Sequence, residues 1–360
     1  MKRLTLGDVC KKASSNIAQK DLQDKMGVYP IYGASGLIKQ VDFYQQDKEY
    51  IAVVKDGAGI GRTMLLPAYS SVIGTMQYLL PKEGIPIDIK YLFYAVEHMN
   101  LAKYFSGATI PHIYFKDYQK EPINIPDIDT QRKISRIFDK IDALIASRKE
   151  QRTKLDQIVK SRFIELFGDT PDNEKQTMAD ICKIITDGTH QPPKFTSTGV
   201  PFLFVSNIVT NEIHYDAEKF ISEETYAELT KRTPIAIGDI LLSTVGSYGH
   251  PAIVKSDKPF CFQRHIAYLK PNADMVNSEY LRSAILSADV QRQIDERVKG
   301  IAQKTLNLSE IRKLRLPVPP VDQQEQFAAF VAQTDKSKYR QEKCIGFFQC
   351  LEKSIRQEWL

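Results

Sequence analysis

The sequence predicts an α+β fold with a pseudo-twofold internal repeat, in which two globular α/β units are separated by two long coiled-coil helices. The end of the chain repeats its middle, because Pro-Asp-Ile-Asp-Thr-Gln at 126–131 returns as Pro-Pro-Val-Asp-Gln-Gln at 319–324. The opening also recurs, with Leu-Gly-Asp-Val-Cys-Lys at 6–11 and Met-Ala-Asp-Ile-Cys-Lys at 178–183. Each copy ends in a long segment with helical hydrophobic spacing. We therefore expect one plan, a globular unit followed by a long helix, to occur twice.

The first 125 residues are expected to be mixed α/β. The β-branched run at 50–54 predicts a strand that ends at the glycine-rich turn of 55–62. A further strand pattern falls within 69–81, and the spacing of apolar residues over 89–100 predicts an amphipathic helix. This unit has the length of an ordinary domain with its own core.

A long helix is predicted over residues 129–167. Asp129 or Thr130 can cap its start after Pro126, and Gly168 followed by Pro171 ends it. At 1.5 Å per residue such a helix spans about 58 Å. A single apolar stripe of this length needs a partner, and the second copy supplies a helix of the same length. The predicted helix–helix interface consists of Ile134, Ile137, Phe138, Ile141, Leu144, Ile145, Leu155, Ile158, Val159, Phe327, Phe330, Val331, Ile345, Phe348, Leu351, Ile355 and Trp359.

The second globular unit covers residues 172–316. The segment 239–249 repeats the strand and glycine turn of the first unit, and Glu-Tyr-Leu at 279–281 repeats Lys-Tyr-Leu at 90–92. The two long helices agree better with each other than the globular parts do. Two modules that read different targets would show this pattern, and so would ordinary drift after a duplication.

The composition is that of a globular protein of 360 residues with 42% hydrophobic and 26% charged residues. No apolar run approaches the ~18 residues of a membrane span, and the N-terminus lacks a signal peptide, so we expect a cytoplasmic protein. The five cysteines form no CxxC pair, which argues against disulfides and zinc. The net charge of +5 is mild, and the basic excess within 131–165 fits either a solvated helix face or a stripe that faces phosphates.

Motifs of catalysis are missing from the sequence. There is no GxxxxGK[ST] phosphate loop, and the glycines of 55–62 do not have GxGxxG spacing. The six histidines show no HxxxH or HxH grouping, so we expect no metal site. Carboxylate patterns typical of nucleases are not convincing either. The sequence therefore favours a binding protein over an enzyme.

Polar side chains on turns and strand ends suit recognition of nucleic acid. Arginine, glutamine and asparagine pair bidentately with base edges, and loops present such side chains well. For any single residue, a satisfied polar group remains an alternative interpretation. The candidate DNA-binding residues are Lys55, Arg62, Gln77, His112, Tyr114, Lys116, His190, Gln191, Lys194, Asn207, Ser247, Tyr248, His250, Gln263, Arg264 and Lys304.

Four motifs follow one another in the second half of the chain. They are the strand and turn at 238–246, Phe-Gln-Arg at 262–264, Gly-Ile-Ala-Gln-Lys at 300–304, and the proline-rich run at 316–320 followed by two glutamines. In this order they resemble the specificity subunit of type I restriction–modification systems. The first half has a looser version, with Gly-Ala-Thr at 107–109, Ile-Pro-His-Ile at 110–113 and Gln131. The resemblance covers the whole chain.

The resemblance implies a non-catalytic subunit that reads a bipartite double-stranded DNA target, one half-site per domain. Residues 1–126 and 171–319 would be the two target-recognition domains, and residues 127–170 and 320–360 the two antiparallel spacer helices. Two modification (methyltransferase) subunits and a restriction (translocase and nuclease) subunit would dock on it. S-adenosylmethionine, ATP and Mg would bind to those partners and no cofactor to this chain.

Two other functions stay open at this point. One is a stand-alone DNA methyltransferase or nuclease, which the missing motifs argue against. The other is a coiled-coil adaptor that binds only protein. Salt-sensitive DNA binding by the chain with its partners would separate the adaptor from a specificity subunit.

Overall fold

A computed structural model describes residues 2–107, 111–231, 233–300 and 303–360. The chain divides into two compact units, one of residues 1–149 with 342–360 and the other of residues 150–341. Each unit therefore contains one globular part, the first half of the long helix that follows it, and the last half of the other long helix. Residues 108–110 and 301–302 of the motifs above lie outside the described residues.

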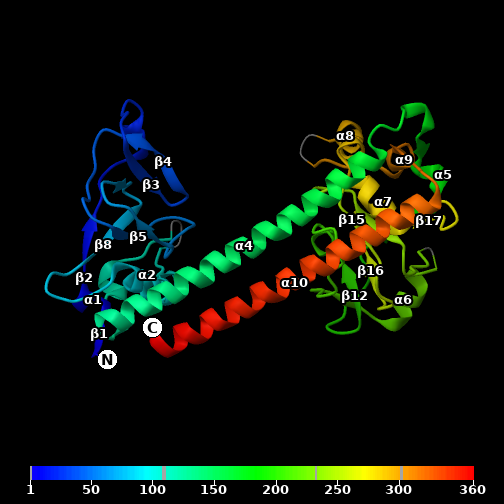
Figure 1. Cartoon of the computed structure of the whole chain (residues 1–360). Coiled ribbons are helices and arrows are strands. Elements are labelled where there is room, and N and C mark those ends of the chain that lie inside the picture. Colours follow the sequence, from blue (N-terminus) through cyan, green and yellow to red (C-terminus); the bar gives the residue numbers. More distant parts are fainter. Residues whose placement is uncertain (1, 108–110, 232, 301–302) are drawn as a thin grey trace. The chain divides into compact units, whose positions relative to one another are not determined.

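The first globular part and its helix contain the elements α1 to α4 and β1 to β9, with two short 3₁₀ turns (Figure 1). They are β1 (Lys2–Thr5), α1 (Leu6–Val9), β2 (Cys10–Ser14), η1 (Gln19–Leu22), β3 (Tyr29–Gly33), β4 (Gly36–Val41), β5 (Tyr50–Val54), β6 (Thr63–Leu66), β7 (Ser71–Val72), β8 (Met76–Pro81), α2 (Ile89–His98), η2 (Leu101–Tyr104), α3 (Phe115–Tyr118), β9 (Pro122–Ile125) and α4 (Ile128–Phe167).

The second globular part and its helix contain the remaining elements. They are η3 (Asp172–Glu174), β10 (Gln176–Thr177), α5 (Met178–Ile181), β11 (Cys182–Asp187), β12 (Val200–Leu203), η4 (Val205–Asn207), β13 (Phe220–Ile221), α6 (Glu223–Leu229), β14 (Ile240–Ser243), β15 (Pro251–Ile253), β16 (Cys261–Phe262), β17 (Ile266–Pro271), α7 (Ser278–Ile285), α8 (Ala288–Arg297), α9 (Leu308–Arg312), β18 (Arg315–Leu316) and α10 (Val321–Trp359).

The sheets of the two units have the same topology. The four-stranded sheet β2-β8-β5-β6 has its counterpart in β11-β17-β14-β15, and β4-β3-β7 has its counterpart in β13-β12-β16. The pairs β3–β7 and β12–β16 are parallel, whereas the neighbouring pairs are antiparallel. The pair β1–β9 likewise matches β10–β18. The predicted internal repeat is thus confirmed, and it extends to every sheet of the described residues.

The repeated opening motif forms the same helix start in both units. Asp8 N–H donates to the Thr5 hydroxyl at 3.2 Å, and Thr5 N–H donates back to the Asp8 carboxylate at 2.8 Å. Thr177 and Asp180 form the same box, in which Thr177 N–H donates to Asp180 at 2.9 Å. This reciprocal capping satisfies backbone donors at the start of α1 and α5.

The glutamine of the repeated motif joins each globular part to its long helix. Gln131 and Gln324 are fully buried, and each amide accepts the N–H of the residue that caps α2 or α7 and donates to two carbonyls. In the first unit these partners are Asp88, Pro86 and Pro126, at 2.8, 3.1 and 2.9 Å. In the second unit they are Asn277, Met275 and Pro319, at 2.9, 3.0 and 2.7 Å. The motif that revealed the duplication is therefore a structural element.

The end of each long helix packs on the start of the other, so the two helices are antiparallel. In the first unit, Arg356 donates to the Tyr94 carbonyl at 3.1 Å and to Glu97 at 2.6 Å, and it lies 5.1 Å from the Phe138 ring. Ile355, Trp359 and Leu360 pack on the same core.

In the second unit the end of α4 contributes aromatic rings in place of an arginine. Phe163 and Phe167 pack against Tyr280 and Phe327, with ring centroids between 5.1 and 5.7 Å apart. Nearby, the Lys338 ammonium of α10 lies 2.6 Å from the Asp156 carboxylate of α4. The two ends of the helix pair thus use different chemistry.

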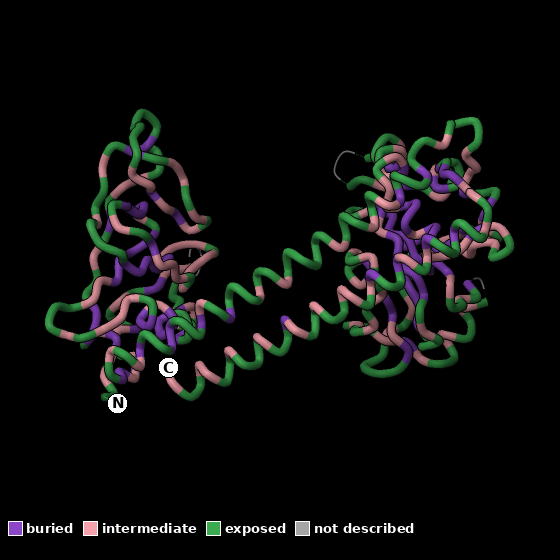
Figure 2. Tube along the Cα trace, viewed as in Figure 1, coloured by how far each residue is buried: buried purple, intermediate pink, exposed green. Residues whose placement is uncertain are grey.

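Six of the 17 predicted interface residues are buried, and the long helices are otherwise largely exposed or half-buried (Figure 2). Ile134, Ile141 and Phe138 belong to the core of the first unit, and Phe327 and Val331 to the core of the second. These residues pack each long helix against the globular part that precedes it. The heptad pattern had predicted contacts between the two helices instead. The buried members are Ile134, Phe138, Ile141, Phe327, Val331 and Ile345; the half-buried ones are Ile145, Leu155, Val159, Phe330, Phe348, Ile355 and Trp359; the exposed ones are Ile137, Leu144, Ile158 and Leu351.

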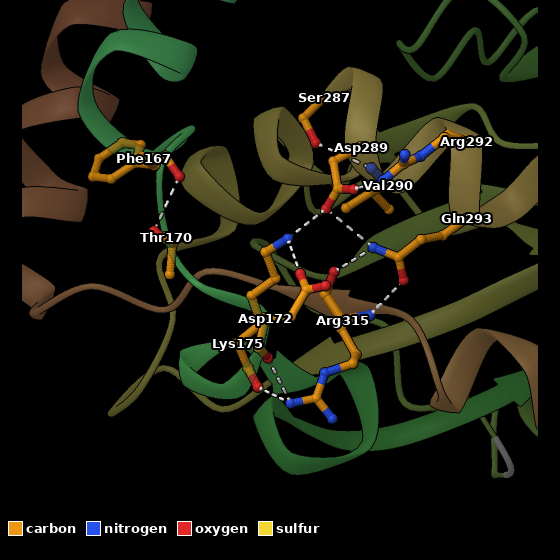
Figure 3. A network of polar contacts seen from close by, with 10 residues as sticks. All are labelled: Phe167, Thr170, Asp172, Lys175, Ser287, Asp289, Val290, Arg292, Gln293 and Arg315. Carbon is orange, nitrogen blue, oxygen red and sulfur yellow. Dashed lines mark hydrogen bonds and ion pairs between the residues drawn. The ribbon is translucent and has the colours of Figure 1, made fainter.

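A polar network holds the segment after α4 against the second globular part (Figure 3). The Lys175 ammonium lies 2.7 Å from Asp172 and 3.0 Å from Asp289, and the hydrogen bond to Asp172 is the main cause that raises the pKa of Lys175. Arg315 donates to the carbonyls of Asp172 and Lys175 at 3.0 and 2.7 Å, and its N–H donates to Gln293 at 3.0 Å. These contacts hold the segment after α4 in place on the second unit.

Within the described residues, no helix is long and apolar enough to cross a membrane.

Candidate nucleic-acid interface

In the second unit, four segments that are distant in the sequence meet beside the four-stranded sheet. Arg264 N–H donates to the Thr189 carbonyl at 3.1 Å, and Thr244 N–H donates to the His265 carbonyl at 3.0 Å. Gly246 N–H then donates to the Lys304 carbonyl at 3.1 Å. These bonds connect the loops that carry most of the predicted DNA-binding residues of this unit. They are His190, Gln191, Ser247, Tyr248, His250, Gln263, Arg264 and Lys304.

Internal contacts orient several of these side chains. The His190 Nε2 atom lies 3.0 Å from the Asp187 carboxylate. The Tyr248 hydroxyl donates to Asp295 at 3.0 Å, and the Lys304 ammonium lies 6.0 Å from the Tyr248 ring. A cation–π contact of this kind holds the lysine ammonium in place and does not neutralise its charge as a carboxylate would.

Exposure distinguishes the side chains that are available to a partner. Gln191, Lys194, Arg264 and Lys304 are exposed, and Gln263 is half-buried. The Arg264 Nε atom lies 3.4 Å from the His265 ring, which leaves the outer guanidinium nitrogens as potential donors. The second unit thus presents amide and basic groups along one series of connected loops.

Two predicted residues of this unit have structural partners instead. Asn207 accepts from Phe204 N–H at 2.9 Å and donates to the His214 carbonyl at 3.1 Å, so its side chain closes its own loop. The His250 ring lies 3.3 Å from both Asn211 and Ser247, and burial lowers its pKa. A neutral, half-buried imidazole at pH 7 supplies no charge for a phosphate.

A small recess of about 180 Å³ lies beside the His190 loop. Its walls include the Asp187–His190 pair and the buried side chains of Cys261 and Phe262. Burial raises the pKa of Cys261 to about 12, so its thiol stays protonated at neutral pH. The recess therefore combines an apolar floor with a polar rim.

In the first unit, the turn after β5 meets the segment around residue 112. Gly57 N–H donates to the Pro111 carbonyl at 3.0 Å, and Ile113 N–H donates to the Lys55 carbonyl at 3.0 Å. The turn needs glycine at position 61, where φ is +78° and a Cβ atom would come within 2.3 Å of Ala102 N. The fold thereby places residues 55 and 112–116 next to each other.

Four predicted residues of the first unit gather at this contact. His112 Nδ1 bonds to the Asp56 carboxylate, and the His112 ring lies 4.1 Å from the Tyr114 ring. The Lys116 ammonium lies 5.2 Å from the same tyrosine ring. With the half-buried Lys55, these groups form a compact basic and aromatic cluster.

The other two predicted residues of the first unit have different environments. Arg62 is exposed and donates to the Ala34 carbonyl at 2.8 Å. Gln77 is only 2% exposed and donates to the Tyr118 hydroxyl. Because this side chain is buried and bonded to Tyr118, Gln77 is not available to DNA, and we withdraw it from the candidate interface together with Asn207.

Sequence reasoning missed the two carboxylates of these clusters. Asp56 bonds to His112 in the first unit, and Asp187 pairs with His190 in the second. Each acid fixes an imidazole, and a carboxylate can also accept a hydrogen bond from cytosine. The only signal was proximity, since Asp56 follows Lys55 directly and Asp187 lies three residues before His190.

Comparison with known proteins identifies the class. The sequence-family model described as the type I restriction modification DNA specificity domain matches residues 1–157 and 171–344 of this chain. The chain therefore belongs to this family. It is the DNA specificity subunit of a type I restriction–modification system, in which catalysis resides in the modification and restriction subunits and the specificity subunit carries no cofactor. The predicted family, fold and function are confirmed, and the stand-alone enzyme and the protein-only adaptor are excluded.

Curated relatives bear the same description. The chain is 20% identical over 301 residues to the type I restriction enzyme MjaVIII specificity subunit of Methanocaldococcus jannaschii, which covers 77% of this chain and 70% of the relative. It is 23% identical over 259 residues to the EcoBI specificity subunit of Escherichia coli, covering 63% of this chain and 54% of that protein. The chain thus spans about half the length of the Escherichia coli relative.

Solved structures share the fold at low identity. The specificity subunit from M. genitalium superposes with a TM-score of 0.57 and 15% identity, covering 99% of this chain and 94% of that one. A chain from a study of complex assembly and conformational transition in the type I system gives a TM-score of 0.58 and 14% identity, covering 99% and 96%. These similarities concern the fold, including the two long helices.

Proposed function

We propose that each globular unit reads one half-site of a bipartite DNA target through its connected loops. Residues 1–126 and 171–319 would be the recognition domains, and residues 127–170 and 320–360 the spacer helices. The observation that carries the proposal is the contrast between framework and loops. The sheets, caps and buried glutamines are repeated in both units, whereas the exposed polar residues beside the sheets differ.

The chemistry of these loops supports roles for particular side chains. Arg264 suits a bidentate contact with guanine, and Gln191 and Gln263 suit adenine. Lys194 and Lys304 of the second unit suit contacts with phosphates. So do Lys55 and Lys116 of the basic and aromatic cluster in the first unit. The half-sites would then differ because the two units present different donors at the same edge of the same fold.

The long helices would set the gap between the half-sites. α4 and α10 contain 40 and 39 residues, so each is about 60 Å long at 1.5 Å per residue. This exceeds one turn of DNA, about 34 Å. Several unread base pairs are therefore expected between the two half-sites.

Assembly would supply the chemistry that this chain lacks. A structure similar to this chain comes from a study of type I complex assembly. We propose that two modification subunits and a restriction subunit dock on the chain, and that S-adenosylmethionine, ATP and Mg bind to those partners. This assembly makes methylation the natural readout of sequence recognition.

Single substitutions in the recognition loops test the proposal. Long-read methylation mapping is done in cells that contain the chain with its modification subunit, and then with Arg264→Ala and Lys116→Ala variants. We expect a two-part motif, with the first variant relaxing one base of the second half-site. Lys116→Ala should lower methylation without changing the motif. A single uninterrupted motif, or none that depends on this chain, would refute two-part recognition.

A further inference from the structure

The His112 ring of the first unit is held by contacts on two sides. Its Nδ1 atom bonds to the Asp56 carboxylate, and its ring lies 4.1 Å from the Tyr114 ring. The backbone is fixed as well, because Ser106 N–H donates to the His112 carbonyl and His112 N–H donates to the Ser106 carbonyl, both at 2.8 Å. The protein therefore sets the orientation of this imidazole before any ligand binds.

The other ring nitrogen of His112 is left for a ligand. Within the described residues, no group forms a hydrogen bond with Nε2. The His112 side chain is 26% exposed, and Asp56 already occupies the Nδ1 side of its ring. A ring nitrogen without a partner, on a partly exposed side chain of the candidate interface, is available to a base.

The carboxylate also decides what Nε2 can do. In a neutral imidazole one nitrogen carries the proton and donates, while the other accepts. The Asp56 carboxylate can only accept, so the proton lies on Nδ1 of His112 and Nε2 has a free lone pair. A lone pair binds hydrogen-bond donors, and the donors on base edges in the major groove are the amino groups of adenine and cytosine. Guanine and thymine present acceptors there.

Lys55 pairs with the carboxylate and not with the imidazole. Its ammonium lies 3.7 Å from Oδ2 of Asp56, whereas His112 bonds to Oδ1. Both oxygens of Asp56 thus have partners in the protein. This leaves Nε2 of His112 as the acceptor without a partner in this cluster.

The pair of carboxylate and imidazole is not part of the repeated framework. The hydrogen bonds that join the glycine turn to this segment recur in the second unit. On the alignment that they give, Val245 lies at the position of Asp56, and Thr305 at that of His112. A valine side chain accepts no hydrogen bond, so the second unit has no such pair at this place. The pair therefore belongs to the part in which the two units differ, where specificity for different half-sites is expected.

We propose that His112 is a specificity-determining residue of the first unit, and that its Nε2 atom accepts a hydrogen bond from the amino group of an adenine or a cytosine in the first half-site. Asp56 is a positioning residue, because it holds the proton on Nδ1 and touches no base. This inference rests on the proposed function, since it assumes that the first unit reads DNA. It adds the class of base edge that is read and the atom that reads it.

Long-read methylation mapping with His112→Ala first identifies the base pair. The cells contain the full chain and its modification subunit. The variant should relax one position of the first half-site and leave the second half-site unchanged. Asp187→Asn is the matched control, because Asp187 holds the imidazole of His190 in the second unit. This control should leave the first half-site unchanged.

Binding to synthetic duplexes then tests the atom. At the position found, the amino-bearing base is replaced by an analogue without the amino group, purine for adenine or 2-pyrimidinone for cytosine. Affinity is measured with the assembled complex at about pH 8, which favours the neutral imidazole. The replacement should weaken the wild-type complex about tenfold, the loss expected for one hydrogen bond. It should weaken His112→Ala less than about twofold, because the accepting nitrogen is already missing.

Asp56→Asn separates the position of the proton from the shape of the site. Lys55 is a donor and would take the amide oxygen, so the amide N–H would turn to Nδ1 of His112. The proton would then lie on Nε2, which becomes a donor. This variant should bind the amino-free duplex as well as the natural one. Thermal unfolding of each variant, compared with wild type, establishes that the chain is folded.

Three results would overturn the inference while leaving a two-part motif in place. His112→Ala may relax no base of the first half-site. Loss of the amino group may weaken wild type and His112→Ala equally, or neither of them. Asp56→Asn may keep the wild-type dependence on the amino group. A two-part motif that does not depend on this chain would instead refute the proposed function, so the two failures are distinguishable.

Discussion

The buried glutamine that joins the second globular part to α10 gives a sharp test of the fold. Gln324 makes three hydrogen bonds at 2.9, 3.0 and 2.7 Å, to Asn277 N–H and to the carbonyls of Met275 and Pro319. Gln324→Ala would leave one backbone donor and two backbone acceptors without these partners. Because the site is fully buried, water replaces them poorly.

The expected loss in the free energy of unfolding follows from the number of hydrogen bonds that Gln324→Ala removes. An unsatisfied buried polar group costs about 1–3 kcal/mol, and partial hydration of the vacated space favours the low end. We expect a loss of about 3 kcal/mol, a large share of the ~5–15 kcal/mol by which a domain is stable. For a unit of this size the melting temperature should fall by roughly 6–12 °C.

Hydrogen exchange and thermal unfolding of the full chain provide the assay. Gln324→Ala should increase hydrogen exchange in α7 and leave α2 unchanged. Gln131→Ala should show the mirror-image effect in the first unit. Gln323→Ala is the control, since that side chain is exposed and its loss should cost less than ~0.5 kcal/mol. Equal effects of Gln323→Ala and Gln324→Ala, or equal loss of protection in both units, would refute the reasoning.

The remaining predictions concern recognition, pH and the helices. On cognate DNA, Arg264→Ala should cost ~1–3 kcal/mol and relax one base, whereas Lys304→Ala should weaken all sequences alike and reduce the salt slope by about 1, as measured by salt-titrated binding. Burial lowers the pKa of His250 below its ordinary value of 6.5. The contribution of His250 to stability is therefore complete above pH 6.5 and is lost as the pH falls from 6.5 towards the pKa of the folded state. His250→Gln should reduce the fall in melting temperature over this pH range. Inserting one heptad into each long helix should add ~10 Å and widen the methylated motif by about three base pairs, which methylation mapping detects. A fragment of residues 1–168 should form only a weak dimer in sedimentation experiments, because Phe163 of one copy would take the place of Arg356 beside Glu97 of the other copy. Phe163→Arg should strengthen this dimer.

Local patterns in the sequence predicted much of the framework. The run at 50–54 forms β5, and the predicted helix over 89–100 forms α2. The helix predicted over 129–167 is α4, from residue 128 to residue 167. These predictions succeed because strand and helix periodicity depend on neighbours in the chain.

Burial of polar side chains was not predictable in this way. Gln77 and Asn207 have the same residue types as good base-reading side chains, yet one donates to Tyr118 and the other closes its own loop. Each of these environments depends on elements that the chain brings together only in three dimensions. The sequence therefore places the candidate interface on loops, whereas the exposure of its individual residues follows only from the structure.

The ends of the long helices show how a duplicated chain specifies its own pairing. Aligned on the buried glutamines, Phe163 and Arg356 occupy equivalent positions, but Phe163 packs against Tyr280 whereas Arg356 pairs with Glu97. Exchanging the two ends would bury a guanidinium among the aromatic rings of the second unit, and an uncompensated buried charge is strongly destabilising. In the first unit the exchange would remove the hydrogen bonds that Arg356 donates to the Tyr94 carbonyl and to the exposed Glu97. Heptad spacing alone permits either helix end to pack on either unit. The diverged ends therefore direct the end of α10 to the first unit and the end of α4 to the second, while the repeated caps and glutamines keep the two frameworks alike.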